Sequence, residues 1–387
     1  MKQNKALWIT PIVFLVLIFG VAILNLSTPD RDFSESENRP LEQRPSFSWD
    51  ALFSGEFTTN VDTWLTDQFP FRDGFIGVKT GTEYAAGKRD TNGVYFAQDG
   101  YLIEKHDQSS VDMPKLQKNV GELSGFVNRE AQRLGTDHVK VMIAPTAGTV
   151  LRGKLPAFAA SQEFDQAAFF EQLRKTLPEG TWIDLLPTFE NAAGSNVDLY
   201  YKTDHHWTTT GAYLAYREWC EAVGVQGLDQ SVFDKKTVTE SFYGTIYSKA
   251  RLSSTKPDKI EAWNPKSGEL DCTIDYNLGQ KSLDSLYDES YLDKKDKYSY
   301  FIGGNNAVAT IHTSVHNGKT LLLIKDSYAH SLAPFLANEF ETIHLIDLRY
   351  FNMPLSQFIE QNPVTDVLVM YNAVTFSDDL GVLKINK

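Results

Sequence analysis

Two short segments of the chain carry residue types suited to nucleophilic acyl transfer. The first, residues 200–207, reads Tyr-Tyr-Lys-Thr-Asp-His-His-Trp and sets one carboxylate beside two imidazoles. The second, residues 321–328, reads Leu-Leu-Leu-Ile-Lys-Asp-Ser-Tyr and sets a serine directly after an apolar run. A hydroxyl, a base and an orienting acid are the three groups that such chemistry needs, so the two segments are expected to meet in the fold.

The serine of the second segment, Ser327, lies where the pattern predicts that a buried strand, 320–324, turns into a helix beginning near Tyr328. A sharp turn of this kind lifts the hydroxyl out of the sheet, and the helix N-terminus favours negative charge beside it. The alternative is that Asp326 and Ser327 merely cap the helix, since both residue types are common caps. The acid and imidazoles of the first segment favour a nucleophile.

His206 is the candidate general base, because imidazole titrates near neutrality. Residues i and i+2 of an extended loop point to the same side, so Asp204 and His206 are expected to share one face, with the carboxylate holding the ring. His205 is then expected to point away. A structural role is the alternative for either histidine, and this geometry favours it for His205.

A metal site is the rival interpretation of the Asp-His-His sequence, because a carboxylate and two imidazoles can bind zinc. Adjacent histidines point in opposite directions unless the backbone is kinked, and no other His-rich or carboxylate-rich segment offers completing ligands. The sequence therefore indicates catalysis without a metal and without a cofactor.

Acyl transfer also needs donors for a developing oxyanion. The backbone N–H of Ser327 is the first candidate, and Asn372 or the turn Gly303-Gly304-Asn305-Asn306 is expected to supply the second. Rings with polar tips suit a sugar surface, although core packing is an equally good reason for them. The candidates of this kind, together with His205, are Tyr200, Tyr201, Trp207, Tyr328 and Tyr371.

The elements that must position these residues alternate between helix and strand. The pattern predicts helices at 164–177, 209–222, 328–338 and 355–361 and strands at 139–144, 181–185, 320–324, 342–347 and 366–371. Such alternation predicts an α/β fold with a mostly parallel sheet flanked by helices. Chemistry gathers at the carboxyl ends of strands in these sheets, and both Ser327 and Asn372 follow such ends. Residues 250–300 are polar and are expected to form an insertion with short strands.

The N-terminus predicts a membrane anchor. Lys2 and Lys5 precede 21 uncharged residues, 6–26. At ~1.5 Å per residue this helix spans the ~30 Å hydrocarbon core. The run is too long for an ordinary signal peptide and lacks a small-x-small cleavage site. The positive-inside rule places residues 1–5 in the cytoplasm and the rest of the chain outside the cell membrane.

The part of the chain beyond the anchor divides by composition. Residues 27–50 contain three prolines and are expected to form a linker. Residues 51–90 show helical periodicity and are expected to pack on the main domain, 91–387. A hairpin is predicted around Asp99-Gly100.

Composition narrows the partners of the protein. The formal net charge of -13 argues against nucleic acid, because phosphate binding depends on clustered Lys and Arg. The two cysteines, Cys220 and Cys272, form no metal-binding motif. They are expected to be ordinary thiols or, outside the cell, a single disulfide.

The residues resemble the DHHW family of bacterial envelope proteins, which are similar to alginate O-acetyltransferases with an SGNH-hydrolase-like domain. The Asp204-His205-His206-Trp207 signature carries this resemblance, and the N-terminal anchor and Lys325-Asp326-Ser327-Tyr328 extend it. Further matching segments are Phe33-Ser34-Glu35, Glu37-Asn38-Arg39, Asp67-Gln68-Phe69-Pro70-Phe71-Arg72, Asn92-Gly93-Val94-Tyr95 and Gly303-Gly304-Asn305.

The resemblance implies that Asp204 orients, His206 is the base and Ser327 is the nucleophile. It also implies a motif order permuted relative to ordinary SGNH hydrolases, whose serine comes first. Lys325 departs from the pattern, because glycine usually precedes the Asp-Ser pair.

The expected activity is O-acetylation of a cell-envelope polysaccharide by a membrane-anchored acyltransferase. The resemblance implies a multi-pass membrane acyltransferase as acyl donor. Two alternatives remain at this point: a carbohydrate esterase that uses the same triad, and a non-catalytic polysaccharide-binding or scaffold protein.

Overall fold

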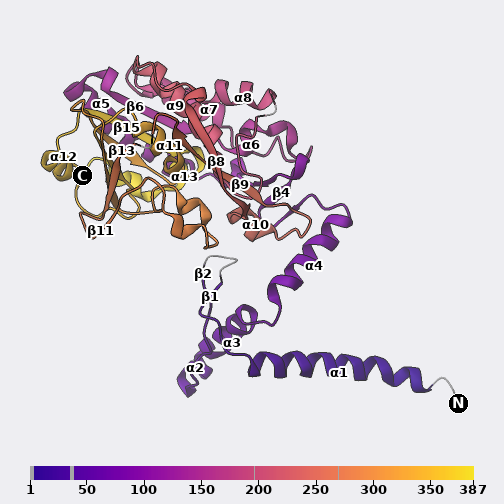
Figure 1. The fold of residues 1–387 in the computed structure, drawn as a ribbon. Coiled ribbons are helices and arrows are strands. Elements are labelled where there is room, and N and C mark those ends of the chain that lie inside the picture. The colour runs from indigo at the N-terminus through magenta and orange to yellow at the C-terminus, as the bar shows by residue number, and fades with distance from the viewer. Residues whose placement is uncertain (1–3, 35–38, 196, 269) are drawn as a thin grey trace. The chain divides into compact units, whose positions relative to one another are not determined.

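The computed structural model describes residues 4–34, 39–195, 197–268 and 270–387 and divides the chain into two compact units (Figure 1). The first unit comprises Met1–Lys88 and Ser248–Ser254. The second comprises Arg89–Tyr247 and Thr255–Lys387. A short segment from the middle of the chain therefore belongs with the N-terminal helices. Glu35, Glu37 and Asn38 of the matching segments lie outside the described residues.

The first unit begins with α1 (Asn4–Ser27), within which Trp8–Ser27 is long and apolar enough to cross a membrane. The unit continues with the two-stranded pair β1 (Phe33–Ser34) and β2 (Arg39–Pro40). Three helices follow: α2 (Trp49–Ser54), α3 (Glu56–Asp67) and α4 (Arg72–Ala85).

Polar contacts fasten the end of α1 and the stretch after it to the end of α3. Asn25 Nδ2 donates to the carbonyl of Gln68 at 2.9 Å, and the guanidinium of Arg39 donates to both carboxylate oxygens of Asp67 at 2.9 and 2.6 Å. The hydrogen bond from Arg39 is the main reason that the pKa of Asp67 is lowered to about 2. Much of the stretch expected to be a linker is thus held against α3.

An eight-stranded sheet forms the centre of the second unit, in the order β11-β10-β12-β14-β13-β15-β6-β7. Neighbouring strands from β14 to β7 are parallel, and the other three pairings are antiparallel. The bounds of the parallel strands are β6 Val139–Ala144, β7 Trp182–Ile183, β13 Thr320–Lys325, β14 Thr342–Ile346 and β15 Asp366–Asn372. The prediction of an α/β fold with a mostly parallel sheet is confirmed.

The antiparallel edge contains β10 (Cys272–Tyr276), β11 (Lys281–Leu283) and β12 (Val308–Thr313). The first two of these strands come from the polar insertion, whose remaining strand, β9 (Asp258–Pro265), pairs with β8 (Phe233–Phe242). A third sheet contains β3 (Asp90–Thr91), β4 (Val94–Phe96) and β5 (Leu102–Glu104). Its β4–β5 pair is the hairpin predicted around Asp99-Gly100.

Helices lie between the strands of the second unit in the sequence, and several of them pack against one another. Helix α9 packs against α11, and α5 packs against α13. Their bounds are α5 Met113–Leu134, α6 Ala147–Val150, α7 Gln166–Thr176, α8 Leu186–Gly194, α9 Thr209–Ala222, α11 Ala329–Leu336, α12 Leu355–Gln361 and α13 Ala373–Asp378. The short helix α10 (Thr245–Ala250) follows β8.

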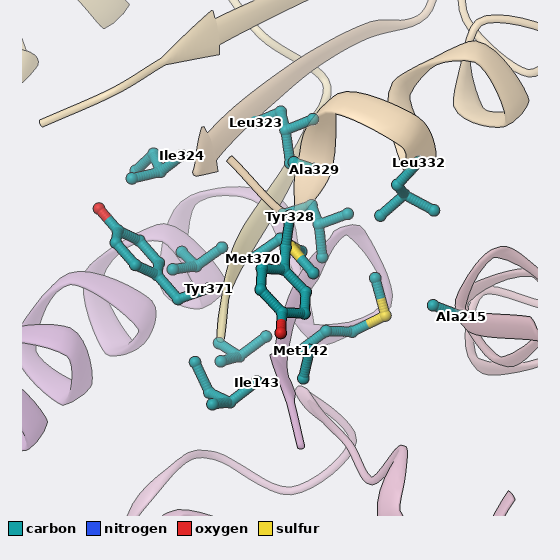
Figure 2. Close-up of a cluster of buried hydrophobic side chains, with 14 of the residues drawn as sticks. Met142, Ile143, Ala215, Leu323, Ile324, Tyr328, Ala329, Leu332, Met370 and Tyr371 are labelled. Carbon is teal, nitrogen blue, oxygen red and sulfur yellow. The ribbon is translucent and has the colours of Figure 1, made fainter. Parts of the chain in front are cut away.

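Buried apolar side chains from three adjacent strands support the turn after β13. Figure 2 shows the ring of Tyr328 among Met142, Leu323, Met370 and Leu332. These side chains are almost completely buried. Packing of this density fixes the backbone that carries the neighbouring serine.

The two cysteines are free thiols in the structure. Cys220 is buried in α9, while Cys272 lies at the start of β10. The alternative of a disulfide between them is therefore not realised.

Candidate active site

A buried aspartate shapes the turn that carries Ser327. One carboxylate oxygen of Asp326 accepts from the N–H of Tyr328 at 2.9 Å, and the other accepts from the backbone and side-chain N–H groups of Asn372, both at 2.8 Å. Burial raises the pKa of Asp326. In the described part of the chain, the N–H of Ser327 itself has no acceptor, as an oxyanion donor requires.

The two predicted segments meet at this turn. His206 Nε2 lies 2.8 Å from Ser327 Oγ, and His206 Nδ1 lies 2.5 Å from Asp204 Oδ1. The other oxygen of Asp204 accepts from the N–H of Thr245 at 2.8 Å and from its hydroxyl at 3.1 Å. Serine, imidazole and carboxylate thus form one continuous chain of hydrogen bonds.

Electrostatics keeps the base neutral and the acid charged. Burial first and a protonated His205 second lower the pKa of His206 to about 4, although Asp204 opposes both effects. Burial alone would raise the pKa of Asp204, but the two histidines and the hydrogen bonds around it hold that pKa well below its usual range. A neutral imidazole beside an ionised carboxylate is the state that can accept a proton from a hydroxyl.

The imidazole of His206 is sandwiched between two other rings. Tyr298 stacks on one face, with ring centroids 3.8 Å apart and planes at 13°. His205 lies 3.9 Å away, with its ring tilted by 36°. The hydroxyl of Tyr298 also donates to the carbonyl of Ser327 at 3.2 Å, so this tyrosine holds both the base and the turn.

The prediction that His205 points away from His206 is wrong. The chain bends through residues 202–206 instead of remaining extended, and the N–H of His206 turns back to Asp204 Oδ1 at 3.1 Å. His205 consequently places its Nδ1 2.8 Å from the hydroxyl of Thr245. The alternation of an extended strand does not apply to such a turn.

The Asp-His-His group does not fit a metal ion as it stands. Ligand atoms of Asp204, His205 and His206 lie within 4.8 Å of one another. However, His206 Nδ1 and Asp204 Oδ1 are only 2.5 Å apart, whereas two ligands of one tetrahedral zinc are separated by about 3.3 Å. The pair has the spacing of a hydrogen bond, and a metal would have to break it.

Asn372 has a different role from the predicted oxyanion donor. Its side-chain oxygen accepts from the N–H groups of Val374 and Thr375 at the start of α13, and its amide nitrogen donates to Asp326 and to the hydroxyl of Thr375. The side chain is fully used in capping the helix and in holding the serine turn. Tyr371 is buried in the core instead of facing a ligand.

The Gly-Gly-Asn turn makes its described contacts elsewhere. Asn305 Oδ1 accepts from Arg349 Nη2 at 3.4 Å, and the carbonyl of Gly304 accepts from Asn306 Nδ2 at 3.3 Å. Among the described residues, neither Gly304 nor Asn305 has a contact with Ser327 that would make it the second donor.

Trp207 and Tyr328 connect the Asp-His-His-Trp segment with the segment that carries Ser327. Trp207 Nε1 donates to the carbonyl of Tyr328 at 2.9 Å and to the hydroxyl of Ser331 at 3.0 Å. The hydroxyl of Tyr328 donates in return to the carbonyl of His205. Both rings are completely buried, so they brace the site and do not offer a surface to a sugar. Tyr200 is buried as well, and its hydroxyl donates to the carbonyl of Pro145.

Lys325, the residue before the Asp-Ser pair, belongs to an internal charged cluster. Its Nζ lies 2.8 Å from His330 Nε2 and 3.6 Å from Asp347 Oδ2, and Arg349 pairs with the same carboxylate. Burial lowers the pKa of Lys325 to about 8, against the pull of Asp347. The lysine therefore supports β13 and β14 from within.

Two residues at this site, Tyr298 and Thr245, were not predicted from the sequence. Tyr298 belongs to the polar insertion, and Thr245 lies just after β8. Neither residue belongs to a recognisable sequence motif. The one available signal was the position of Gly244, since glycine often marks a place where two parts of the chain approach closely.

Comparisons with known proteins place the chain in a family. A DHHW family protein from Eubacterium siraeum is 26% identical with a TM-score of 0.63, and the match covers 77% of this chain and 96% of that one. Bacillus cereus PatB1 with a sulfonyl adduct is 20% identical with a TM-score of 0.61, and the match covers 76% of this chain and 100% of PatB1. At that identity, PatB1 shows a shared fold alone.

A third similar structure is the O-acetyltransferase domain of Pseudomonas putida AlgJ, which is 14% identical with a TM-score of 0.46. The match covers 76% of this chain and 98% of that domain. Among curated proteins no match is found. The model of the family described as DHHW protein matches residues 122–346, which is more than half of the chain. The chain therefore belongs to the DHHW family.

Proposed function

We propose that the protein is a membrane-anchored, extracytoplasmic O-acyltransferase that acetylates a cell-envelope polysaccharide through an acyl-serine intermediate. The observation that carries the proposal is the chain of hydrogen bonds from Asp204 through His206 to Ser327, at 2.5 and 2.8 Å. The unpaired N–H of Ser327 beside it provides one donor for an oxyanion.

In the first half-reaction, Ser327 Oγ attacks the carbonyl carbon of the acyl donor and passes its proton to His206 Nε2. The tetrahedral intermediate collapses, the bond to the leaving group breaks, and that group takes the proton from His206. The acyl group is then held as an ester on Ser327.

In the second half-reaction, a sugar hydroxyl attacks the same carbonyl carbon and gives its proton to His206 Nε2. The ester bond to Ser327 breaks, and the serine oxygen recovers that proton. Asp204 remains ionised throughout and stabilises the imidazolium that forms in each half-reaction.

Helix α1 supports the membrane-anchored part of the proposal by its length and apolar composition. The two lysines before it support an orientation with the remaining residues outside the cell membrane. The acyl donor is the multi-pass membrane acyltransferase that the family resemblance implies.

Substitution of the serine tests the proposal. Ser327→Ala removes the nucleophile while leaving the buried supports in place, so acetylation of the envelope polymer should be abolished and the unfolding temperature should not change. Ser241→Ala, at an exposed serine on β8, is the matched control and should acetylate normally. Unchanged acetylation by Ser327→Ala would refute the proposal.

A covalent probe separates catalysis from mere binding. PatB1 carries a sulfonyl adduct, so a sulfonyl fluoride or fluorophosphonate is a suitable reagent for this fold. Labelling of the full chain that is lost in Ser327→Ala favours the enzyme, and the absence of labelling favours a scaffold. Free acetate alone from p-nitrophenyl acetate with an oligosaccharide present would indicate an esterase.

A further inference from the structure

A polar cavity lies at the base of the Asp-His-His-Trp turn. It has a volume of about 260 Å³ and is lined by residues on both sides of that turn, 200–202 and 208–210, by Asp198 and by the first residues of β9. Nothing in the proposed chemistry uses these groups. The cavity is large enough for one sugar unit and is open to solvent on one side.

The lining offers hydrogen-bond donors that the protein does not use. Thr208 caps α9 by accepting from the N–H of Gly211, which leaves the N–H groups of Thr209 and Thr210 without acceptors in the described part of the chain. Free N–H groups at a helix N-terminus bind oxygen atoms readily.

The ring of Tyr201 forms one wall of the cavity. Tyr201 is 2% exposed, and its hydroxyl is enclosed within the protein. The hydroxyl of Thr209, its neighbour in the lining, is already used, because it donates to the carbonyl of Glu261 at 2.5 Å. The donors that remain for a ligand are therefore the backbone N–H groups at the start of α9 and the ammonium groups of the lining.

Charges in the lining indicate which ligand fits. The lining contains three carboxylates and two ammonium groups, and Lys259 is paired with Glu261 at 2.6 Å. Both hydrogen-bond acceptors and donors are therefore available to the hydroxyls of a sugar. The excess of negative charge disfavours a sugar that carries its own carboxylate.

The cavity is joined directly to the candidate active site. Tyr200 and Trp207 form a bridge across the turn, and the N–H of Tyr201 donates to the carbonyl of His206 at 3.2 Å. The ring of Tyr201 also contacts that of Tyr298, which stacks on His206. A polymer held in the cavity is thus bound by the same turn that carries the base.

We propose that this cavity is an acceptor subsite that binds one uncharged sugar unit of the polysaccharide, so that a neighbouring unit reaches Ser327. This inference rests on the proposed function and adds the substrate class, a neutral glycan, to it. The donors are the N–H groups of Thr209 and Thr210 and the ammonium group of Lys202, and the acceptors include Glu261.

Filling the cavity tests the subsite. In the full chain in detergent, Thr210→Phe and Glu261→Gln should each raise the KM for a neutral oligosaccharide acceptor by about tenfold, the effect of one or two lost hydrogen bonds. Transfer should fall relative to p-nitrophenyl acetate hydrolysis by the same variant. Glu221→Gln, at the exposed far end of α9, is the control and should keep the KM of the unaltered chain.

Three results would overturn the inference: an unchanged KM in Thr210→Phe, a parallel loss of transfer and hydrolysis, or equal use of neutral and uronic-acid oligosaccharides. If the unaltered chain transfers no acetyl group, the proposed function fails by itself. Calorimetric titration with the neutral oligosaccharide then tests the subsite separately, since binding must be present in the unaltered chain and lost in Thr210→Phe.

Discussion

At the scale of single residues, the environment of His206 decides how the site responds to pH. Its ring is buried between Tyr298 and His205, and the hydroxyl of Ser327 and the carboxylate of Asp204 occupy its two nitrogens. Because a second positive charge beside His206 is unfavourable, the pKa of His206 is lowered to about 4, first by burial and then by His205.

Replacing His205 should therefore move the acid limit of activity. In His205→Gln the pKa of His206 rises towards its ordinary value, so kcat/KM for p-nitrophenyl acetate should begin to fall at a pH higher by roughly one unit. The measurement is a pH–rate profile between pH 4 and 8 (roughly the range in which imidazoles titrate). His316→Gln, at an exposed histidine, is the control; a limb that stays in place or moves to lower pH would contradict the argument.

Residue types made the central groups predictable and left their surroundings hidden. Asp204, His206 and Ser327 stand out because few roles require an acid, an imidazole and a serine in such positions. Tyr298 and Thr245 could not be found, because Tyr298 contacts His206 across 92 residues and Thr245 contacts Asp204 across 41 residues, and such contacts leave no local pattern. The orientation of His205 was mispredicted because the pattern cannot distinguish a bend from an extended loop.

At the scale of elements, the carboxylate of Asp204 depends on the connection between β8 and α10. Gly244 lies against it so closely that a Cβ there would come 2.2 Å from Asp204 Cβ and 2.3 Å from Asp204 Oδ2. The following residue, Thr245, supplies the two hydrogen bonds to that carboxylate. Glycine is therefore required for the approach of the two segments.

The substitution Gly244→Ala should displace the carboxylate without removing any functional group. A shift of about 1 Å in a catalytic group can cost roughly 100-fold in rate, so kcat for p-nitrophenyl acetate should fall by about that factor. Gly121→Ala, in α5 where an added Cβ meets nothing within 4 Å, should leave kcat unchanged. If Gly244→Ala turns over at the unaltered rate, the packing argument fails.

The parallel strands were predictable because each is a short run of apolar residues between amphipathic helices, as in β6, β13 and β15. Strands β10 and β11 were not predictable, because they are polar and owe their conformation to their pairing partners. Strand β10 pairs with β12, and β11 pairs with β10. Local sequence is a weak guide to strands whose stability comes from their neighbours.

At the scale of the whole molecule, the proposed location of the chemistry depends on α1. Its apolar segment, Trp8–Ser27, has the length for one passage through a bilayer. We expect the full chain to sediment with membranes and to resist alkaline carbonate extraction. Protease added to intact spheroplasts should digest the chain beyond residue 27; release into the soluble fraction, or protection from the protease, would contradict a single-pass anchor with this orientation.

The contacts between α1, Arg39 and the end of α3 have a further consequence for proteolysis of the protein. If the chain were cleaved between β2 and α2, the two fragments would remain associated, because Asn25 and Arg39 of one fragment donate hydrogen bonds to Gln68 and Asp67 of the other. Because the pKa of Asp67 is lowered to about 2, its carboxylate stays charged in mild acid, and the two fragments would remain associated there. Separation of the rest of the chain from α1 would require cleavage after the C-terminal end of α3.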